Sequence, residues 1–435
     1  MKIYESVIND KSETSFPEKF LYHVWDEQHI KYKDYKKKIL KSNSGKDIKI
    51  HFQGHFNTMS GADFKNAIIE INKKNYTGDV EIHINSSDWY NHQHDNNYAY
   101  NTVVLHVVLN HNNHRNITIN ENGGKIEILE LKNIISEDIE KLFRRYSATD
   151  YKFTERYCTL FSSLRPEFLE KLLIKSGMER LEKKINRFKA ELSFVSIDQL
   201  FYQSILEALG YSKNKTQFYL FSKDYKWLGF KQQFGNRNNP ASLHDFVDDL
   251  VFKAEFDTNK YGWYLFRIRP CNHPRTRLYQ IAPFIFDSFE TSMTTEIVKL
   301  FSFTQDNFSI KNFKKRLLDK LSKANSFTKH RLGQDRIYAI VINIFIPILI
   351  IYANKNNDSE LSRLCYTIYN DFQGLETNNI STIMQKYMSE EQFAISEKKA
   401  INQQGILNIY HKFCINNLCK MCKENILSFI NQIGE

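Results

Sequence analysis

The chain has 435 residues, too many for one compact core of ordinary size, so the sequence predicts two domains. Its hydrophobic share of 42% is near the globular norm, and 33 Phe with 24 Tyr supply large side chains for a core. The net charge of +10 and the pI of about 9.0 permit a polyanionic partner but specify none.

Two stretches bear on where the protein resides. The N-terminus, MKIYESVINDKSETS, lacks the apolar core of a signal peptide, so we expect a cytoplasmic protein. The apolar run from Ile337 to Ala353 is interrupted by Asn343 and Pro347 and falls short of the roughly 20 residues that a membrane span needs. It therefore predicts a buried helix, kinked near Pro347, and no membrane contact.

Residues 1–135 predict an α/β domain with a mixed central sheet. A helix is expected to begin at Ser15-Phe16-Pro17-Glu18, where a hydroxyl precedes a carboxylate by three residues. About five strands follow, at residues 44–54, 62–74, 78–85, 102–111 and 125–131. A turn is expected at Tyr76-Thr77-Gly78, between the second and third of these strands.

From residue 136 onward the spacing of apolar residues becomes helical. Ser136, followed by two acidic residues, indicates a helix start, and we place the domain boundary there. Residues 136–435 are therefore expected to form a mainly α-helical lobe.

Side chains able to do chemistry concentrate between residues 54 and 108. Asp63 lies at a strand start and Glu81 in the middle of the next strand, where alternation in GDVEIHIN places His83 on the same face. Carboxylates at the ends of adjacent strands can converge on Mg²⁺ or Mn²⁺, which polarises a phosphodiester and activates a water. Alternatively, Asp63 is a turn residue and Glu81 lies on an exposed strand face.

This pattern resembles the restriction-endonuclease-like (PD-(D/E)xK) nuclease superfamily. The core of that superfamily is helix, three strands, helix and strand, with an Asp opening the second strand and an acidic-x-Lys triplet on the third. The resemblance implies metal-dependent hydrolysis of nucleic acid, with Asp63 and Glu81 as metal ligands and His83 assisting the attacking water. It also implies that Glu18, in the preceding helix, is a further acidic ligand.

His83 stands where the superfamily has Lys, so the permanent cation at that position is missing. A catalytically inactive nucleic-acid-binding module is therefore an alternative.

The histidines support a different metal site. His83, His92, His94 and His106, with Asp88, could give zinc three ligands and an open position for water, as in a zinc-dependent hydrolase. We expect His92-Gln93-His94 to be extended, with both rings on one side. No established zinc motif such as H-E-x-x-H is present, so the alternative is exposed loop histidines and a hydrogen-bonded His106 in the core.

Several motifs are similar to those of an uncharacterised bacterial family, domain of unknown function 2851. They are GADF, GDVEIH, DWYNHQH, Y-x-x-V-x-LHVV, LGYSKNKTQF and RPCNHPRTRLYQIA, with the C-terminal Cys group. The first motif is usually G-P-D-F in that family, so Ala62 is a departure, at a position that only shapes the turn. The resemblance covers nearly the whole chain and implies no settled activity.

Four arginines surround a Pro-punctuated turn of the second lobe: Arg267, Arg269, Arg275 and Arg277. They could hold the phosphates of nucleic acid, for which DNA is the expected partner, in bidentate contacts. Alternatively, they pair with the carboxylates of HDFVDDL and join two helices.

Three cysteines form a C-x₄-C-x₂-C pattern near the C-terminus: Cys414, Cys419 and Cys422. With Cys158 as a distant fourth ligand they could hold a structural zinc ion or an iron–sulfur cluster, as some nucleases of the superfamily do. Alternatively, they are small buried hydrophobic residues on a helix.

Overall fold

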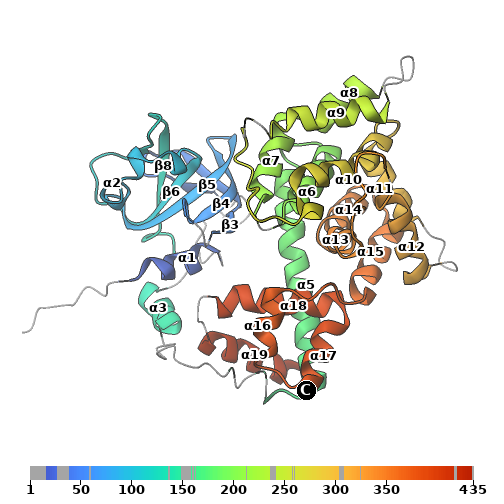
Figure 1. Cartoon of the computed structure of the whole chain (residues 1–435). Coiled ribbons are helices and arrows are strands. Elements are labelled where there is room, and N and C mark those ends of the chain that lie inside the picture. Colours follow the sequence, from blue (N-terminus) through green and yellow to red (C-terminus); the bar gives the residue numbers. More distant parts are fainter. Residues whose placement is uncertain are drawn as a thin grey trace, which may run out of the picture. The chain divides into compact units, whose positions relative to one another are not determined.

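The computed structural model describes residues 16–26, 39–57, 60–135, 138–147, 158, 161, 163–211, 213–235, 242–256, 258, 260–302, 308–323, 325–415 and 419–433. The chain divides into two compact units, one of residues 1–155 with 411–432, the other of residues 156–410 with 433–435. A mixed sheet forms the first unit and helices form the second, which confirms the predicted fold class (Figure 1).

The first unit is built on one eight-stranded sheet, in the order β1-β2-β4-β5-β6-β8-β7, with β3 paired to β4. β5 pairs in parallel with β6, and β6 with β8, while the other neighbours are antiparallel. The strands are β1 Ile39–Lys41, β2 Asp47–Phe52, β3 His55–Phe56, β4 Phe64–Ile71, β5 Lys74–Asn85, β6 Val103–Asn110, β7 Ile117–Ile119 and β8 Lys125–Glu130.

Helical elements cover both faces of this sheet. The apolar side of α1 (Glu18–Asp26) packs with Val80 and Ile82 of β5, whereas Trp89 of α2 (Asp88–Asn91) packs with Val103 and Ile126. Because parallel strands need a crossover connection, β5 and β6 are joined by a long segment. It contains α2, η1 (His94–Asn96) and η2 (Tyr98–Tyr100), and it carries His92. The unit also includes α3 (Ile139–Ser147) and α19 (Cys419–Ile433).

The hairpin between β4 and β5 corrects one prediction. Its turn is Asn72-Lys73, with φ of 48° and 65°, as a type I′ turn requires, so the turn predicted at residues 76–78 is wrong. Gly78 lies inside β5 instead. A Cβ there would lie 2.3 Å from Cγ1 of Val104, so the close approach of β6 requires glycine.

The second unit consists of helices. They are α5 Pro166–Glu191, α6 Ile197–Leu209, α7 Lys215–Asp224, α8 Trp227–Phe234, α9 Leu243–Lys253, η3 Pro270–Asn272, α10 Pro274–Asp287, α11 Met293–Phe301, α12 Ile310–Leu321, α13 Gln334–Ile340, η5 Val341–Phe345, α14 Ile346–Lys355, α15 Ser359–Asp371, α16 Asn379–Gln385, α17 Glu390–Lys398 and α18 Ala400–Ile409, followed by η6 Tyr410–Cys414. α18 lies against α5, and a Cβ on Gly405 would meet the Leu173 carbonyl oxygen at 2.2 Å.

The apolar run of the sequence lies in a helix from Gln334 to Lys355, the one described helix that is long and apolar enough to cross a membrane. Its most apolar window is 78% buried inside the protein, which confirms the predicted buried helix. The helix changes to a π-helical turn at η5, just before Pro347. Because proline has no N–H, the Asn343 carbonyl lacks its usual partner, and the wider turn accommodates this loss.

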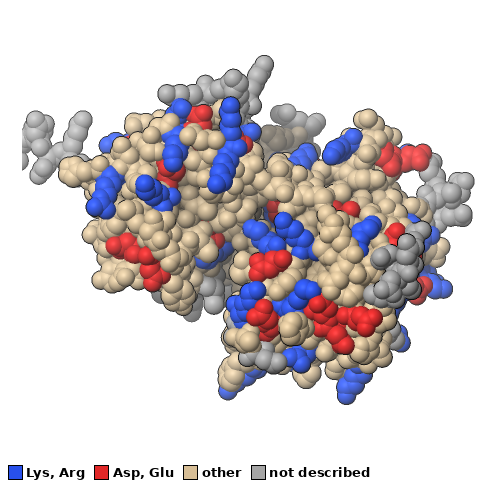
Figure 2. All heavy atoms as spheres, turned by 90° about the horizontal axis from the view of Figure 1, so that it is seen from above, with Lys and Arg blue, Asp and Glu red and all other residues tan. Residues whose placement is uncertain are grey.

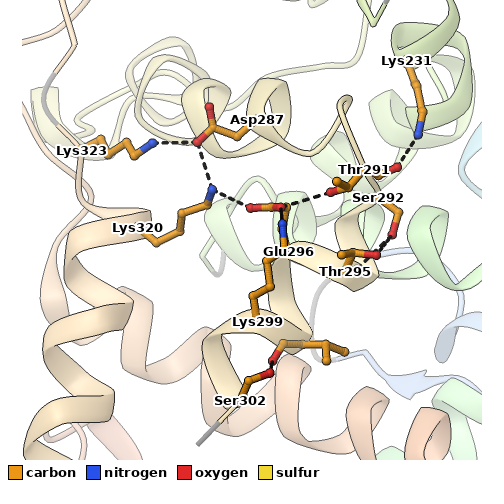
Figure 3. A network of polar contacts seen from close by, with 11 residues as sticks. Lys231, Asp287, Thr291, Ser292, Thr295, Glu296, Lys299, Ser302, Lys320 and Lys323 are labelled. Atoms are coloured by element: carbon orange, nitrogen blue, oxygen red, sulfur yellow. Dashed lines mark hydrogen bonds and ion pairs between the residues drawn. The ribbon is translucent and has the colours of Figure 1, made fainter.

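A network of ion pairs joins α10, α11 and α12 (Figure 3). Lys320 lies 2.6 Å from Glu296 and 3.2 Å from Asp287, and Lys299 lies 2.7 Å from Glu296. Burial opposes ionisation of Glu296, but hydrogen bonds from Lys299 and Lys320 outweigh it and lower the pKa of Glu296 to about 2. The carboxylate therefore stabilises the folded state at neutral pH.

A Glu296→Gln variant is expected to lose about 2 kcal/mol of unfolding free energy at pH 7. Because the folded pKa is depressed, this contribution is present above the unfolded pKa of about 4.5 and is lost as pH falls towards 2. Urea denaturation at pH 7 and pH 3 measures it, with the exposed Glu290→Gln as control. A difference from wild type that stays the same at both pH values would contradict this assignment.

Candidate functional site

The candidate site forms where β4 begins and β5 continues past it. Phe64, the first residue of β4, pairs with Val80, whereas β5 extends to Asn85. The backbone N–H of Ile82 lies beyond this pairing and donates to Oδ2 of Asp63 at 2.9 Å. Since a buried N–H needs an acceptor, the Asp63 carboxylate takes the place of a strand partner. Polar side chains can therefore gather at this point of the sheet.

The structure brings Asp63 and Glu81 together. The backbone N–H of Asp63 donates to Oε2 of Glu81 at 3.1 Å, and the Tyr22 hydroxyl of α1 hydrogen-bonds the Asp63 carboxylate. Glu18, one turn before Tyr22 on α1, is near enough to raise the pKa of both carboxyl groups. All three acidic residues of the predicted site thus belong to one cluster.

These carboxyl groups bind protons unusually tightly. Burial, followed by repulsion from Glu81, raises the pKa of Asp63 to about 7. Burial raises the pKa of Glu81 to about 8, although the hydrogen bond from Asp63 opposes this, and burial also raises the pKa of Glu18. Such shifts concentrate at functional sites, and a divalent cation would displace the protons.

Two histidines lie near one oxygen of Glu81, and a third contacts one of them. Nε2 of His94 lies 3.2 Å from Oε1 of Glu81, and Nε2 of His83 lies 3.6 Å from the same atom and 3.1 Å from Nδ1 of His92. His83 and His94 are buried, whereas His92 is exposed. The cluster therefore opens to solvent at His92.

His83 is held from behind by a chain of hydrogen bonds. Its Nδ1 contacts Nε2 of the fully buried His106 at 2.9 Å, and Nδ1 of His106 contacts the Thr118 hydroxyl at 2.8 Å. When Nδ1–H of His106 donates to Thr118 and Nδ1–H of His83 donates to Nε2 of His106, Nε2 of His83 is left unprotonated. Its lone pair then faces Glu81. Partners of this kind orient the histidine ligands of metal sites.

The donor set fits a metal ion. In the part of the chain that the structure describes, His83, His92 and His94 are the one group of three donors found to converge, with ligand atoms within 4.8 Å of one another. Two ligands about 2.1 Å from one ion lie at most about 4.2 Å apart, so the rings would need to close by at least about half an ångström. Burial lowers the pKa of His94 and lowers that of His83 to about 2, which keeps both rings neutral.

The segment that presents His92 and His94 differs from its prediction. Gln93 has a φ of 59° and His94 begins η1, so the expected extended conformation is wrong. The turn nevertheless places the two ring centroids 5.5 Å apart, because the His94 ring stacks on Tyr100 at 3.7 Å. Nδ1 of His94 is buried without a hydrogen-bond partner.

Asp88 hydrogen-bonds residues of its own segment and is not among the donors found to converge. Its carboxylate accepts hydrogen bonds from the Asn85 N–H, at 2.9 Å, and from the Asn91 amide, at 3.2 Å. Three residues of the site were missed from the sequence: Tyr22, Tyr100 and Thr118. Only Tyr22 carried a signal, because it lies four residues after Glu18 on the same helix face.

The arginines of the helical unit have different environments. Arg267 and Arg269 are exposed, Arg275 lies over the Phe256 ring at 5.2 Å, and Arg277 is 4% exposed. The carboxylates of HDFVDDL bind nearby groups instead: Asp245 bonds Ser242, Asp248 pairs with His244, and Asp249 pairs with Lys253. Among the described residues, no ion pair joins these arginines to the carboxylates of this segment.

The cysteines lie in and beside the last helices. Cys414 ends η6 and is half-buried, Cys419 begins α19 and is exposed, and Cys422 is 4% exposed. Cys158 is half-buried. Among the described side chains these four do not provide three convergent ligand atoms, and a cysteine-bound metal stays a prediction.

Fold and site together define a two-unit α/β and helical protein with a buried carboxylate–histidine centre. The chain belongs to the family described as "Protein of unknown function (DUF2851)", whose model matches residues 18–244 and 246–379. This confirms the family resemblance of the sequence motifs, and the match includes every residue of the centre but ends before Cys414. No curated protein and no solved structure matches the chain.

Proposed function

We propose that this protein is a metal-dependent hydrolase of phosphodiester bonds in nucleic acid, with DNA as the first candidate. The observation that carries the proposal is the contact of Asp63 and Glu81 beside three convergent histidines. Carboxylate and neutral imidazole together suit Mn²⁺ or Zn²⁺ better than Mg²⁺.

The order of elements supports the proposal. A helix (α1), an antiparallel β2-β4-β5 meander, a crossover and a parallel β6 follow the arrangement of the restriction-endonuclease-like superfamily, with Asp63 just before the second strand of the meander and Glu81 on the third. Two features depart from that arrangement. The crossover helix α2 has only four residues, and His83 replaces the lysine.

The side chains divide the work as follows. Asp63, Glu81 and the histidines would hold the ion, which supplies charge to the phosphodiester and a water of lowered pKa. With a pKa of about 2, His83 is a better ligand than base, because a general base works best when its pKa is near the working pH.

Incubation with labelled DNA and RNA tests the proposal. The full chain, purified without added metal and assayed by elemental analysis, is expected to cleave one of these substrates when Mn²⁺, Zn²⁺ or Mg²⁺ is added. Absence of cleavage with all three ions would overturn the hydrolase. Binding to DNA that still weakens with salt would then favour the inactive module.

A zinc-dependent hydrolase of another substrate is the second candidate, favoured by the convergence of His83, His92 and His94. It predicts one tightly bound zinc per chain that is lost in the double variant His92→Ala, His94→Ala and kept in the exposed control His114→Ala. Stoichiometric zinc without cleavage of nucleic acid would favour this candidate over the nuclease. Equal zinc content in all three proteins would exclude it.

A further inference from the structure

Six cationic side chains of the helical unit lie within electrostatic reach of one another, two of them at Tyr211, and we call them the Tyr211 cluster. They are Arg180, Lys184 and Arg187 of α5, Lys215 of α7, Arg277 of α10 and Arg336 of α13. Burial lowers the pKa of Lys184, and the charges of Arg180, Lys215 and Arg187 lower it further. The ring of Tyr211 has Arg336 at 3.3 Å and Arg277 at 4.8 Å from its centroid.

Most of this positive charge is not neutralised by the protein. Glu191 and Glu207 lie 2.8 and 2.9 Å from Arg187 and form ion pairs with it. Within the described parts of the chain, the other five cations form no ion pair. Four of these five side chains are partly or fully buried, whereas Lys215 is exposed. Buried charges without a counter-ion are costly, so an excess of this kind favours a compensating anion.

Two of the cations share one neutral acceptor. Nε of Arg180 and Nζ of Lys184 lie 2.9 and 3.0 Å from the same Gln404 side-chain oxygen. Lys184 also donates to the side-chain oxygen of Asn343. These amide oxygens satisfy hydrogen bonds but contribute no negative charge, and the two cations are held close together.

Arg277 and Arg336 each keep a buried donor unused. Arg277 donates to the side-chain oxygens of Gln280 at 2.8 Å and Asn272 at 2.5 Å, and to the Tyr211 hydroxyl, while Arg336 donates to the Ala208 carbonyl at 3.2 Å. The Nε atoms of both arginines are buried without a hydrogen-bond partner. Each is therefore a donor that an incoming oxyanion could satisfy.

The backbone adds positive potential at the same place. Lys215 is the first residue of α7, Arg277 lies in the first turns of α10, and Arg336 is the third residue of the helix that begins at Gln334. Helix N-termini carry partial positive charge and exposed N–H groups. Tyr211 has a φ of 52°, an unusual conformation for an aromatic residue and one that clusters at functional sites.

We propose that the Tyr211 cluster binds a phosphate group. Guanidinium groups match the geometry of phosphate oxygens, and a dianion would offset much of the unpaired charge. On the face shown in Figure 2, Lys and Arg are interspersed with Asp and Glu. The proposal stands apart from the hydrolytic centre, which belongs to the other unit.

Titration of the full chain in a phosphate-free buffer tests the site. The probes are inorganic phosphate, a nucleoside monophosphate, and one oligonucleotide with a 5′-phosphate or a 5′-hydroxyl, measured by calorimetry and by thermal unfolding. Lys184→Met and Arg336→Met are each expected to weaken phosphate binding about tenfold or more, because each removes a charged donor. The exposed Lys189→Met on α5 is the matched control and should bind like wild type.

A second readout separates this site from a purely structural network. Without phosphate, Lys184→Met should unfold at a higher temperature than wild type, because it replaces a buried amine, whose ionisation the neighbouring cations oppose, with a neutral side chain. A lower unfolding temperature together with unchanged phosphate affinity would overturn the proposal, as would the absence of heat and thermal shift with all probes. Preference for the 5′-phosphorylated oligonucleotide identifies a nucleic-acid end as the ligand, whereas equal binding of inorganic phosphate identifies a small phosphate.

Discussion

The Asp63→Asn variant is expected to lose cleavage of nucleic acid by about 10³-fold or more, because an amide cannot supply the negative oxygen that holds and charges the metal centre. The fold should survive. The Asn oxygen can still accept from the Ile82 N–H, which the carboxylate binds at 2.9 Å, and from the Tyr22 hydroxyl. On the proposed function, the expected result is a protein that is folded but nearly inactive.

The measurement is the single-turnover rate on labelled substrate with saturating Mn²⁺, beside circular dichroism and thermal unfolding. Glu70→Gln on β4, the strand that follows Asp63, is the control, because Glu70 contacts His51 at 3.0 Å and lies outside the cluster. Its rate should equal that of wild type. If Asp63→Asn cleaves as fast as wild type, Asp63 is not a metal ligand. The proposed similarity to the nuclease superfamily then fails as well.

The alternation of polar and apolar residues in GDVEIHIN predicted β5 correctly. It also predicted that Glu81 and His83 lie on the same face, because alternate residues of a strand point to the same face. It could not predict that β4 begins opposite Val80 and leaves Ile82 to be satisfied by Asp63. That fact depends on register between strands, which a single strand does not encode. The hairpin turn was misplaced for a similar reason, since Gly78 serves the packing of β6.

The two histidines of the crossover show a second limit. Their convergence depends on the left-handed Gln93 and on the stack of His94 against Tyr100, neither of which spacing alone indicates. The Tyr211 cluster could not be predicted from local sequence at all, because Lys184 and Arg336 come from segments far apart in the chain. Only tertiary packing reveals which charges meet without partners.

The pH dependence of stability offers a test of the centre that needs no substrate. The folded pKa of Glu81, about 8, lies above its ordinary value of 4.5, so the folded state favours the protonated form. For a raised pKa, the stabilising contribution is fully present below the unfolded pKa and is lost as pH rises through the folded pKa. Metal-free wild type should therefore lose stability between about pH 4.5 and pH 8.

A Glu81→Gln variant should escape this loss and exceed metal-free wild type by about 3 kcal/mol of unfolding free energy at pH 9. Its amide is neutral at every pH, and its oxygen can accept from the Asp63 N–H as the protonated acid does. Urea denaturation in EDTA at pH 5, 7 and 9 measures the difference, with Glu70→Gln as control.

Added Mn²⁺ should reverse the order of the two proteins. Wild type gains stability with ion concentration, because binding to the folded state alone shifts the unfolding equilibrium, whereas the variant lacks a charged ligand and gains little. If the unfolding free energies of wild type and Glu81→Gln change in the same way with pH in EDTA, Glu81 has an ordinary pKa in the folded state. Such a result would mean that the cluster lowers the stability of the fold without an ion and that ion binding restores it. The carboxylates would then serve ion binding and not the stability of the fold.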